Sequence, residues 1–174
     1  IDEAYADFVE PNLNYNSKEL IDTFNNVLIL RTLSKGYSLA GIRTGYLIGD
    51  PSLLEPIALK TKDSYNIGAI AQELSCAALS DQSYARKNWG KIIRERKRLR
   101  QELTFLGFEI IESQSNFLLA KAPVDAKQVY EKLKEDGVLV RYFNTPRLSS
   151  YVRITIGTVE ENNRLLFLIQ KLLD

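Results

Sequence analysis

Residues 31–46 are of types that could do chemistry. They read Arg-Thr-Leu-Ser-Lys-Gly-Tyr-Ser-Leu-Ala-Gly-Ile-Arg-Thr-Gly-Tyr and follow an apolar run. The amine of Lys35 can form an imine with an aldehyde. Thr32, Ser34 and Arg43 offer hydroxyl and guanidinium donors to an anion such as phosphate. Pyridoxal 5′-phosphate carries both an aldehyde and a phosphate, so this stretch predicts a site for that cofactor.

The composition excludes several other kinds of catalytic site. The chain has no histidine and a single cysteine, Cys76. It therefore cannot by itself form a Ser-His-Asp triad, a Cys-His pair or the usual zinc ligand sets, and no metal site is predicted. Cys76 lies in an apolar run and is predicted to be a small buried residue rather than a nucleophile. A lone cysteine makes no internal disulfide, which favours a reducing compartment.

The overall balance of residues is typical of a globular protein. Of the 174 residues, 45% are hydrophobic and 26% are charged, and the net charge is +1. No apolar stretch approaches the roughly 20 residues that a membrane span needs, and the first residues do not resemble a signal peptide. We therefore expect a cytoplasmic protein with no membrane partner. Because the chain begins at Ile1 and contains no methionine, we also expect it to be a piece of a longer polypeptide.

Apolar periodicity predicts an α/β region followed by an α+β region, with a boundary near residue 80. The continuous apolar runs 27–30 and 45–49 are typical of parallel strands covered on both faces. A helix that begins at Pro51 should form only short or kinked pieces because of Pro56, and another helix is predicted over 67–79.

The second region is predicted to open with one long helix over 81–106 that ends at Gly107. Strands should follow at 109–111, 116–120, 138–143 and 151–156, with helices at 125–136 and 160–173. The long helix carries a set of basic residues, Arg86, Lys87, Lys91, Arg94, Arg96, Lys97, Arg98 and Arg100. A nucleic-acid interface is one interpretation of them. The near-neutral net charge and the lack of a recognisable binding module make a solvated helix face the plainer interpretation, so no nucleic-acid partner is predicted.

Five motifs together resemble the fold-type I pyridoxal-phosphate-dependent aminotransferases, and among them histidinol-phosphate aminotransferase. They are Asp-Glu-Ala-Tyr at 2–5, Ser-Lys at 34–35, Leu-Ala-Gly-Ile-Arg-Thr-Gly-Tyr at 39–46, Ser-Asn-Phe at 115–117 and Val-Arg-Ile-Thr-Ile-Gly-Thr at 152–158. The resemblance covers essentially the whole chain, in the order of the C-terminal half of such an enzyme. It implies that residues 1–80 belong to the large cofactor-binding α/β domain. Residues 81–174 would then be an interdomain helix and a small C-terminal α+β domain.

The resemblance implies roles for the residues around the lysine. Lys35 would hold the cofactor as an imine and later move a proton between the substrate's α-carbon and the cofactor. Arg43 and Ser34 would bind the cofactor phosphate, with Thr32 a weaker candidate. Without the family, Ser34 and Thr32 are also explained as turn or capping residues.

The first residues would contact the cofactor ring. The resemblance implies that Asp2 pairs with the protonated pyridine nitrogen and that Tyr5 donates to the phenolic oxygen. Taken without the family, an acid and a tyrosine at this spacing are merely loop residues. Loops at the carboxyl ends of strands converge in open α/β sheets, so their distance from Lys35 in sequence is no objection.

Substrate recognition is assigned to arginines near the end of the chain. In the family an arginine at the position of Arg153 binds the substrate's anionic group, and Arg141 could join it around a phosphate. A half-exposed strand arginine is the alternative for each. Arg147, beside Pro146, is predicted to be a surface residue. The pair Tyr65-Asn66 resembles a segment near the family's active-site and dimer contacts, without roles that transfer to the single residues.

The resemblance implies an enzyme of histidine biosynthesis, a homodimer when intact, that moves an amino group between L-glutamate and histidinol phosphate. Other parts of the cofactor site would lie before Ile1, so the isolated fragment is expected to be inactive. Three alternatives stay open at this point: an aromatic amino-acid aminotransferase, an enzyme like the threonine-phosphate decarboxylases, and a noncatalytic interaction fragment. Which bond breaks depends on the pose of the substrate on the cofactor, and residue types do not determine that pose.

Overall fold

The computed structural model describes residues 1–174, which divide into two compact units. Unit 1 comprises residues 1–89 and unit 2 comprises residues 90–174. The units divide within helix α5 (Gln82–Phe105), whereas the predicted domain boundary near residue 80 lies just before that helix. The assignment of domain roles to the two parts stays a prediction. None of the helices combines the length and apolar character that a membrane span requires.

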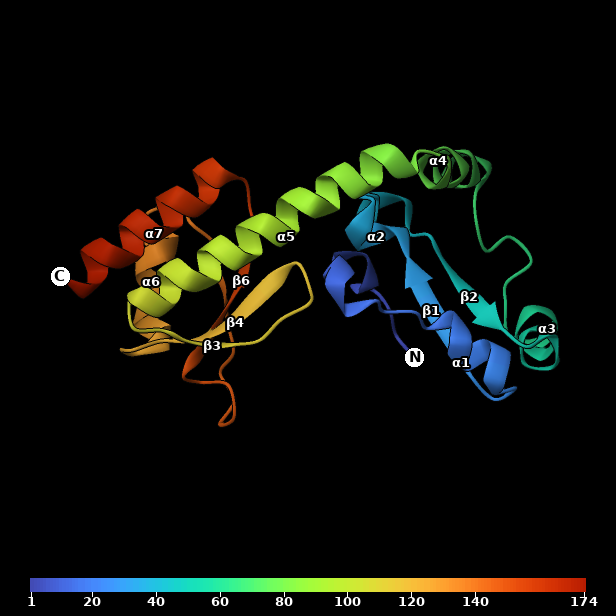
Figure 1. The fold of residues 1–174 in the computed structure, drawn as a ribbon, viewed down its shortest axis with the longest axis horizontal. Helices are drawn as coiled ribbons and strands as arrows, with labels where there is room; N and C mark the ends of the chain where they lie inside the picture. The colour runs from blue at the N-terminus through green and yellow to red at the C-terminus, as the bar shows by residue number, and fades with distance from the viewer. The chain divides into compact units, whose positions relative to one another are not determined.

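Unit 1 is built around a two-stranded ribbon with short helices along it (Figure 1). The strands are β1 (Leu28–Thr32) and β2 (Gly45–Gly49), and they pair antiparallel from Leu28 opposite Gly49 to Thr32 opposite Gly45. The helical elements before α5 are η1 (Ala6–Phe8), η2 (Pro11–Leu13), α1 (Lys18–Thr23), α2 (Leu33–Gly36), η3 (Ala40–Ile42), α3 (Pro51–Lys60) and α4 (Ala69–Ser80).

The prediction of two parallel strands covered on both faces is wrong for this ribbon. Parallel pairing is confined to one isolated bridge between Asp2 and Leu30, beside the antiparallel pair. On β2, the side chains of Tyr46, Leu47 and Ile48 are 38%, 37% and 43% exposed. Because neighbouring residues point to opposite faces, residues 1–174 leave both faces of this strand partly exposed. A continuous apolar run shows that both faces of a strand are apolar, but it does not determine the direction of the neighbouring strand.

Helix α3 runs through Pro56 as one element of ten residues, where the sequence predicts short or kinked pieces. Asp50 caps the helix, because its carboxylate accepts from the backbone N–H of Ser52 at 2.8 Å and from the Ser52 hydroxyl at 2.6 Å. Pro51 occupies the first turn, where its missing N–H has no intrahelical partner to lose.

The prediction that Cys76 is buried is wrong, because Cys76 is exposed on α4. Within that helix only Ser75 is buried, and Ile70 and Leu74 are exposed as well. An apolar run predicts a face that avoids water, and unit 1 offers this face no covering element.

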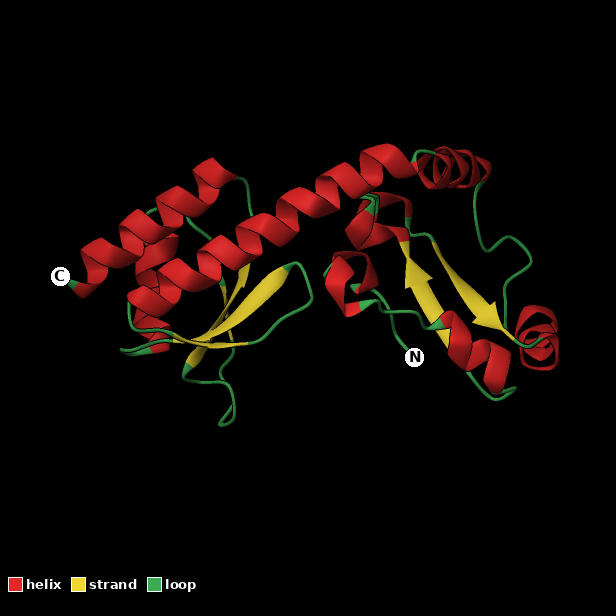
Figure 2. Ribbon diagram, in the orientation of Figure 1, coloured by secondary structure: helices red, strands yellow, loops and turns green.

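Unit 2 is an antiparallel sheet with the strand order β3-β4-β6-β5. The strands are β3 (Glu109–Ile111), β4 (Phe117–Lys121), β5 (Arg141–Tyr142) and β6 (Tyr151–Thr155), and the helices are α6 (Ala126–Glu135) and α7 (Val159–Leu173). Figure 2 shows these helices and strands in separate colours. The strand predicted over 138–143 is shorter than expected, because only Arg141 and Tyr142 find partners on β6.

One face of this sheet forms the core of unit 2. Leu118 and Ala120 of β4 and Val152 and Ile154 of β6 are buried in a single cluster with apolar residues of α5, α6 and α7. Strand residues alternate between the two faces of a sheet, so the residues between them lie on the opposite face. This outer face is where Arg153 lies.

Helix ends in unit 2 follow the sequence signals closely. Gly107 and Gly137 adopt φ angles of +86° and +76°, a region that favours glycine, and they follow α5 and α6. Thr158 and Glu161 form a reciprocal capping box at the start of α7. Among the basic residues of α5, Arg96 is buried and donates to the backbone oxygen of Ser115 at 2.8 Å, so it serves the fold of unit 2.

Candidate functional site

The predicted cofactor lysine lies on a one-turn helix that directly follows β1. Thr32 ends the strand in extended conformation and caps α2, because its hydroxyl oxygen accepts from the backbone N–H of Ser34 at 3.1 Å. The same hydroxyl lies 3.0 Å from Ser34 Oγ and 3.3 Å from the backbone oxygen of Thr44. The capping role that the sequence left open for Thr32 is therefore present, and this cap determines where α2 and Lys35 begin.

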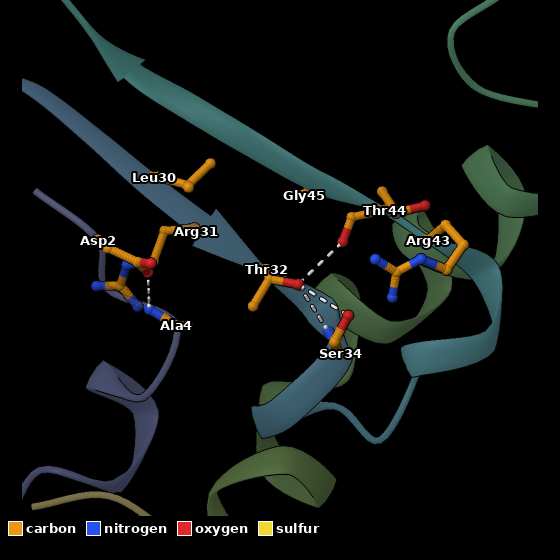
Figure 3. Close-up of a pocket in the computed structure, with 9 residues that line it drawn as sticks. All are labelled: Asp2, Ala4, Leu30, Arg31, Thr32, Ser34, Arg43, Thr44 and Gly45. Carbon is orange, nitrogen blue, oxygen red and sulfur yellow. Dashed lines mark hydrogen bonds between the residues drawn. The ribbon is translucent and has the colours of Figure 1, made fainter. Parts of the chain in front are cut away.

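A pocket of about 310 Å³ opens beside this cap. Figure 3 shows the residues that line it, which are Asp2, Ala4, Leu30, Arg31, Thr32, Ser34, Arg43, Thr44 and Gly45. Four of the predicted cofactor-binding residues, Asp2, Thr32, Ser34 and Arg43, are thus brought to one cavity from separate elements. Thr44 and Gly45, which are not among the predicted site residues, complete the wall where β2 begins.

Arg43 reaches the pocket from a left-handed backbone position. Its φ is +55°, and it ends η3 just before β2. The guanidinium donates to the backbone oxygen of Ala40 at 3.2 Å, and Figure 3 shows it on the side of the pocket where Thr32 and Ser34 lie. A guanidinium has five N–H donors, so this one bond leaves most of them available to an anion.

Asp2 lies across the pocket from Arg43 (Figure 3). It occupies the isolated bridge beside Leu30, and its Oδ1 accepts from the backbone N–H of Ala4 at 3.0 Å. The side chain is exposed, which leaves its carboxylate oxygens accessible from the cavity. The pocket therefore has hydroxyl and guanidinium donors on one side and a carboxylate acceptor on the other.

Lys35 and Tyr5 lie near each other and are not among the residues that line the pocket. The Nζ atom of Lys35 is 5.9 Å from the centroid of the Tyr5 ring. Lys35 is exposed, and its backbone directly follows that of the pocket residue Ser34. The six predicted cofactor residues of unit 1 thus form two groups, one around the pocket and one around the lysine.

A group of charged residues, of which Glu3 is buried and Asp7 and Arg31 are partly buried, connects the segments that carry these residues. No sequence motif pointed to this group. Arg31 Nε lies 2.7 Å from Glu3 Oε2, at ion-pair distance but without the alignment of a hydrogen bond. Arg31 Nη1 lies 3.3 Å from Asp7 Oδ1, and the Tyr15 hydroxyl donates to Glu3 Oε1. We call Glu3, Asp7 and Arg31 the charge cluster. In sequence, each member lies within two residues of a predicted site residue, namely Asp2, Tyr5 or Thr32. Charged residues so close to the motifs are the sequence feature from which the cluster could have been predicted.

Two opposing influences act on the carboxyls of this cluster. Burial by itself raises the pKa of Glu3, but the hydrogen bonds from Tyr15 and Ser17 and the charge of Arg31 outweigh it and leave the pKa lowered. For Asp7, burial dominates and raises the pKa, although Arg31 opposes the shift. Of the two carboxyls, Glu3 is therefore the one whose charged form is favoured beside Arg31.

Asp7 also fits against the helix that carries the lysine. A Cβ atom on Gly36 would lie 2.0 Å from Asp7 Oδ2 and 2.9 Å from Asp7 Cβ, which no packing allows. The residue after Lys35 must therefore lack a side chain for Asp7 to take this place. The charge cluster thereby connects the first residues of the chain to α2.

In unit 2 the structure brings Arg141 and Arg153 together. They are direct partners in the β5–β6 register, and both lie on the outer face of the sheet. Arg141 is exposed and Arg153 is half-buried. Arg147 lies outside both strands and is exposed, as the sequence predicts.

Comparison with known proteins identifies the family. Residues 1–169 match the family model for aminotransferases of class I and II. The chain belongs to this family. It is 45% identical to histidinol-phosphate aminotransferase 1 of Trichormus variabilis over 174 residues, which are 99% of the chain and 48% of the relative. The chain thus spans about half the length of this relative.

Solved structures agree on the fold. The histidinol-phosphate aminotransferase of Clostridium acetobutylicum superposes with a TM-score of 0.90 at 26% identity, over 99% of this chain and 53% of that one. The enzyme of Sinorhizobium meliloti, solved in complex with pyridoxal-5′-phosphate, gives a TM-score of 0.84 at 28% identity over 98% and 48%. The predicted α/β fold of a fold-type I aminotransferase is therefore confirmed. The prediction that the match lies in the C-terminal half of such enzymes stays a prediction.

Proposed function

We propose that this chain is part of a pyridoxal-phosphate-dependent aminotransferase of histidine biosynthesis. It would move an amino group between L-glutamate and histidinol phosphate, with 2-oxoglutarate and imidazole acetol phosphate as the keto partners. The observation that carries the proposal is the convergence of Asp2, Ser34 and Arg43 on one pocket next to Lys35. Membership of the aminotransferase family gives this convergence its chemical meaning.

The residues around the pocket fit pyridoxal phosphate in charge and donor type. The cofactor has a phosphate that requires donors, a ring nitrogen that requires an acceptor when protonated, and an aldehyde that requires an amine. Arg43 and Ser34 supply the donors, Asp2 the acceptor and Lys35 the amine. When bound, the cofactor supplies an electron sink for the charge that develops at the substrate's α-carbon.

Each residue then has a separate task. Arg43 and the Ser34 hydroxyl bind the phosphate, and Thr32 holds the start of α2 in place through its capping bonds. Asp2 would place its carboxylate against the protonated ring nitrogen, and Tyr5 would offer its hydroxyl to the phenolic oxygen. Lys35 would hold the cofactor through Nζ and, as a free amine, would accept and return the proton of the substrate's α-carbon.

Recognition of the substrate is assigned to the arginine pair of unit 2. Histidinol phosphate has a phosphate and no α-carboxylate, whereas glutamate has carboxylates only, so one site must accept two kinds of anion. Arg153 would receive either anion, and Arg141 would add its charge when the anion is a phosphate. We further propose that the intact enzyme is a cytoplasmic homodimer.

The test of this function is the attachment of the cofactor to Lys35. The complete protein is incubated with pyridoxal phosphate and reduced with borohydride, and the modified lysine is located by mass spectrometry. We expect the adduct on Lys35, its complete loss in Lys35→Ala, and no change in the control Lys60→Ala at the end of α3. An adduct on another lysine in the wild-type protein would refute the assignment.

The reaction itself is tested separately. Glutamate is supplied with imidazole acetol phosphate or with an aromatic keto acid, and release of carbon dioxide from a phosphorylated amino acid is measured in parallel. Amino transfer to imidazole acetol phosphate with the highest kcat/KM would support the proposal. Preferred transfer to the aromatic acceptor, or decarboxylation, would replace it by the corresponding alternative.

A further inference from the structure

The outer face of the sheet in unit 2 holds two arginines and two phenylalanines close together. Arg141 and Arg153 are direct cross-strand partners, and Phe143 follows on the same side as Arg141, two residues along the chain. The side-chain alternation is verified by Tyr142, whose ring stacks on Tyr130 of α6 at 6.1 Å on the other face. Phe117 of β4 pairs with Thr155 and is therefore a diagonal neighbour of Arg153.

The two phenylalanines contact the arginines unequally. The guanidinium carbon of Arg153 lies 5.2 Å from the ring centroid of Phe117 and 6.0 Å from that of Phe143. The guanidinium carbon of Arg141 lies 5.6 Å from the ring centroid of Phe143. These distances are within the range of cation–π attraction. Of the two rings, Phe143 thus lies within this range of both arginines, whereas Phe117 lies within this range of Arg153.

Two cations in direct cross-strand register repel each other, and such pairs destabilise a sheet. A structural pair would be relieved by a carboxylate, but the salt bridges of unit 2 include neither Arg141 nor Arg153. In addition, Arg153 Nε is buried and has no hydrogen-bond partner. A buried donor without an acceptor is costly unless a ligand supplies one.

We propose that Phe143 is a positioning residue that holds the guanidinium groups of Arg141 and Arg153 as one pair for a dianionic phosphate. Phe117 supports the guanidinium of Arg153. This inference rests on the proposed function, in which Arg153 receives either substrate anion and Arg141 adds its charge for the phosphate. The new element is Phe143. By holding both guanidinium groups together, Phe143 would favour the phosphorylated substrate over a carboxylate.

The physical reason is the exposure of Arg141. A long exposed side chain samples many rotamers, and fixing it around a ligand costs conformational entropy. The Phe143 ring provides one surface for both guanidinium groups, so this cost is smaller when the phosphate binds. A carboxylate that needs only Arg153 gains little from it. Loss of Phe143 should therefore weaken phosphate binding more than carboxylate binding, whereas loss of Phe117 should weaken both alike.

The geometry is tested by NMR on the complete protein, through the Nε–Hε signals of Arg141 and Arg153. The two signals are assigned with Arg141→Lys and Arg153→Lys. We expect Phe143→Leu to shift both signals because a ring current is removed from each, and Phe117→Leu to shift that of Arg153 only. Phe143→Tyr keeps a ring and should retain both positions, and Phe167→Leu, at an exposed position of α7, is the control.

The function is tested by titrating the same variants with inorganic phosphate and with acetate. Phe143→Leu should weaken phosphate binding about three- to tenfold, as expected for loss of partly exposed cation–π contacts, and should change acetate binding much less. Equal effects of Phe143→Leu and Phe117→Leu on both anions would overturn the inference. If Arg141→Ala and Arg153→Ala leave phosphate binding unchanged, the anion site of the proposed function fails instead. If Arg141→Ala and Arg153→Ala weaken phosphate binding but Phe143→Leu does not, the anion site stands and only the positioning role of Phe143 fails.

Discussion

The two units are stabilised in different ways. In unit 2 the sheet and its helices bury one contiguous apolar cluster, which includes Leu103, Leu118 and Ile154. The buried apolar residues of unit 1 are few, namely Phe8, Ile29, Leu33 and Ala85, while its strand β2 exposes Tyr46, Leu47 and Ile48. Unit 1 instead pairs charges at partly buried positions, in the cluster of Glu3, Asp7 and Arg31.

The predicted cofactor residues thus lie in the unit with the smaller apolar core. Unit 2 buries its apolar side chains against one another, so its fold is stabilised by ordinary hydrophobic burial. In unit 1 the residues assigned to the cofactor stand on short elements, which are held by caps, by close backbone approach and by paired charges. Such local devices hold specific atoms in place, but each contributes less stability than an apolar core.

The largest effect should come from the core of unit 2. Leu118→Ala removes a fully buried side chain and should cost about 2–5 kcal/mol of unfolding free energy, since it creates a cavity. Ile48→Ala on β2, where the side chain is 43% exposed, should cost about 1 kcal/mol or less. Hydrogen exchange of the strand amides, followed by NMR in each unit, measures both losses. Equal losses would show that the contrast between the units is wrong.

A smaller effect is expected where unit 1 depends on close approach. Gly36→Ala places a methyl group where Asp7 lies, so Asp7 must move away from Arg31, and we expect a loss of about 1–3 kcal/mol. Gly41→Ala meets nothing within 4 Å and should be neutral or slightly stabilising.

A double-mutant cycle shows whether Asp7 is the cause. In an Asp7→Ala background, Gly36→Ala should lose most of its cost, because the clashing carboxylate is gone. Chemical denaturation followed by the fluorescence of Trp89 reports on this unit, since the indole N–H donates to the backbone oxygen of Gly36 at 2.6 Å. An unchanged cost would place the strain elsewhere.

The smallest effect should be a pH dependence in unit 2. Hydrogen bonds from Arg98, opposed by burial and aided by Asn162, lower the pKa of Glu95 below its ordinary value of 4.5. A lowered pKa in the folded state contributes stability that is fully present above the ordinary value and is lost as the pH falls through the lowered one.

Glu95→Gln should therefore reduce the unfolding free energy by about 0.5–1 kcal/mol at pH 7, and the difference should vanish at low pH. Unfolding curves of both proteins between pH 7 and pH 2 measure it, with Glu131→Gln on the exposed surface of α6 as the control. A difference that stays constant over this range would indicate a packing effect instead of a charge effect.

Most of the regular elements could be predicted from local patterns. The period of apolar residues located α5, α6 and α7, and Gly107 and Gly137 marked helix ends that the structure confirms. The errors occurred where a pattern depends on its neighbours. The direction of β1 and β2, the exposure of Cys76 and the short β5 are all decided by which partner covers or pairs with the segment.

The sequence by itself determined the family and the residue types of the candidate site, because the motifs around Asp2, Lys35, Arg43 and Arg153 lie within short local stretches. Only the tertiary structure decided which of these residues share a cavity and what holds them. The charge cluster, the fit of Asp7 against Gly36 and the shared contacts of Phe143 join residues far apart in the chain. Such contacts depend on distances in space, and no local pattern of residues encodes these distances.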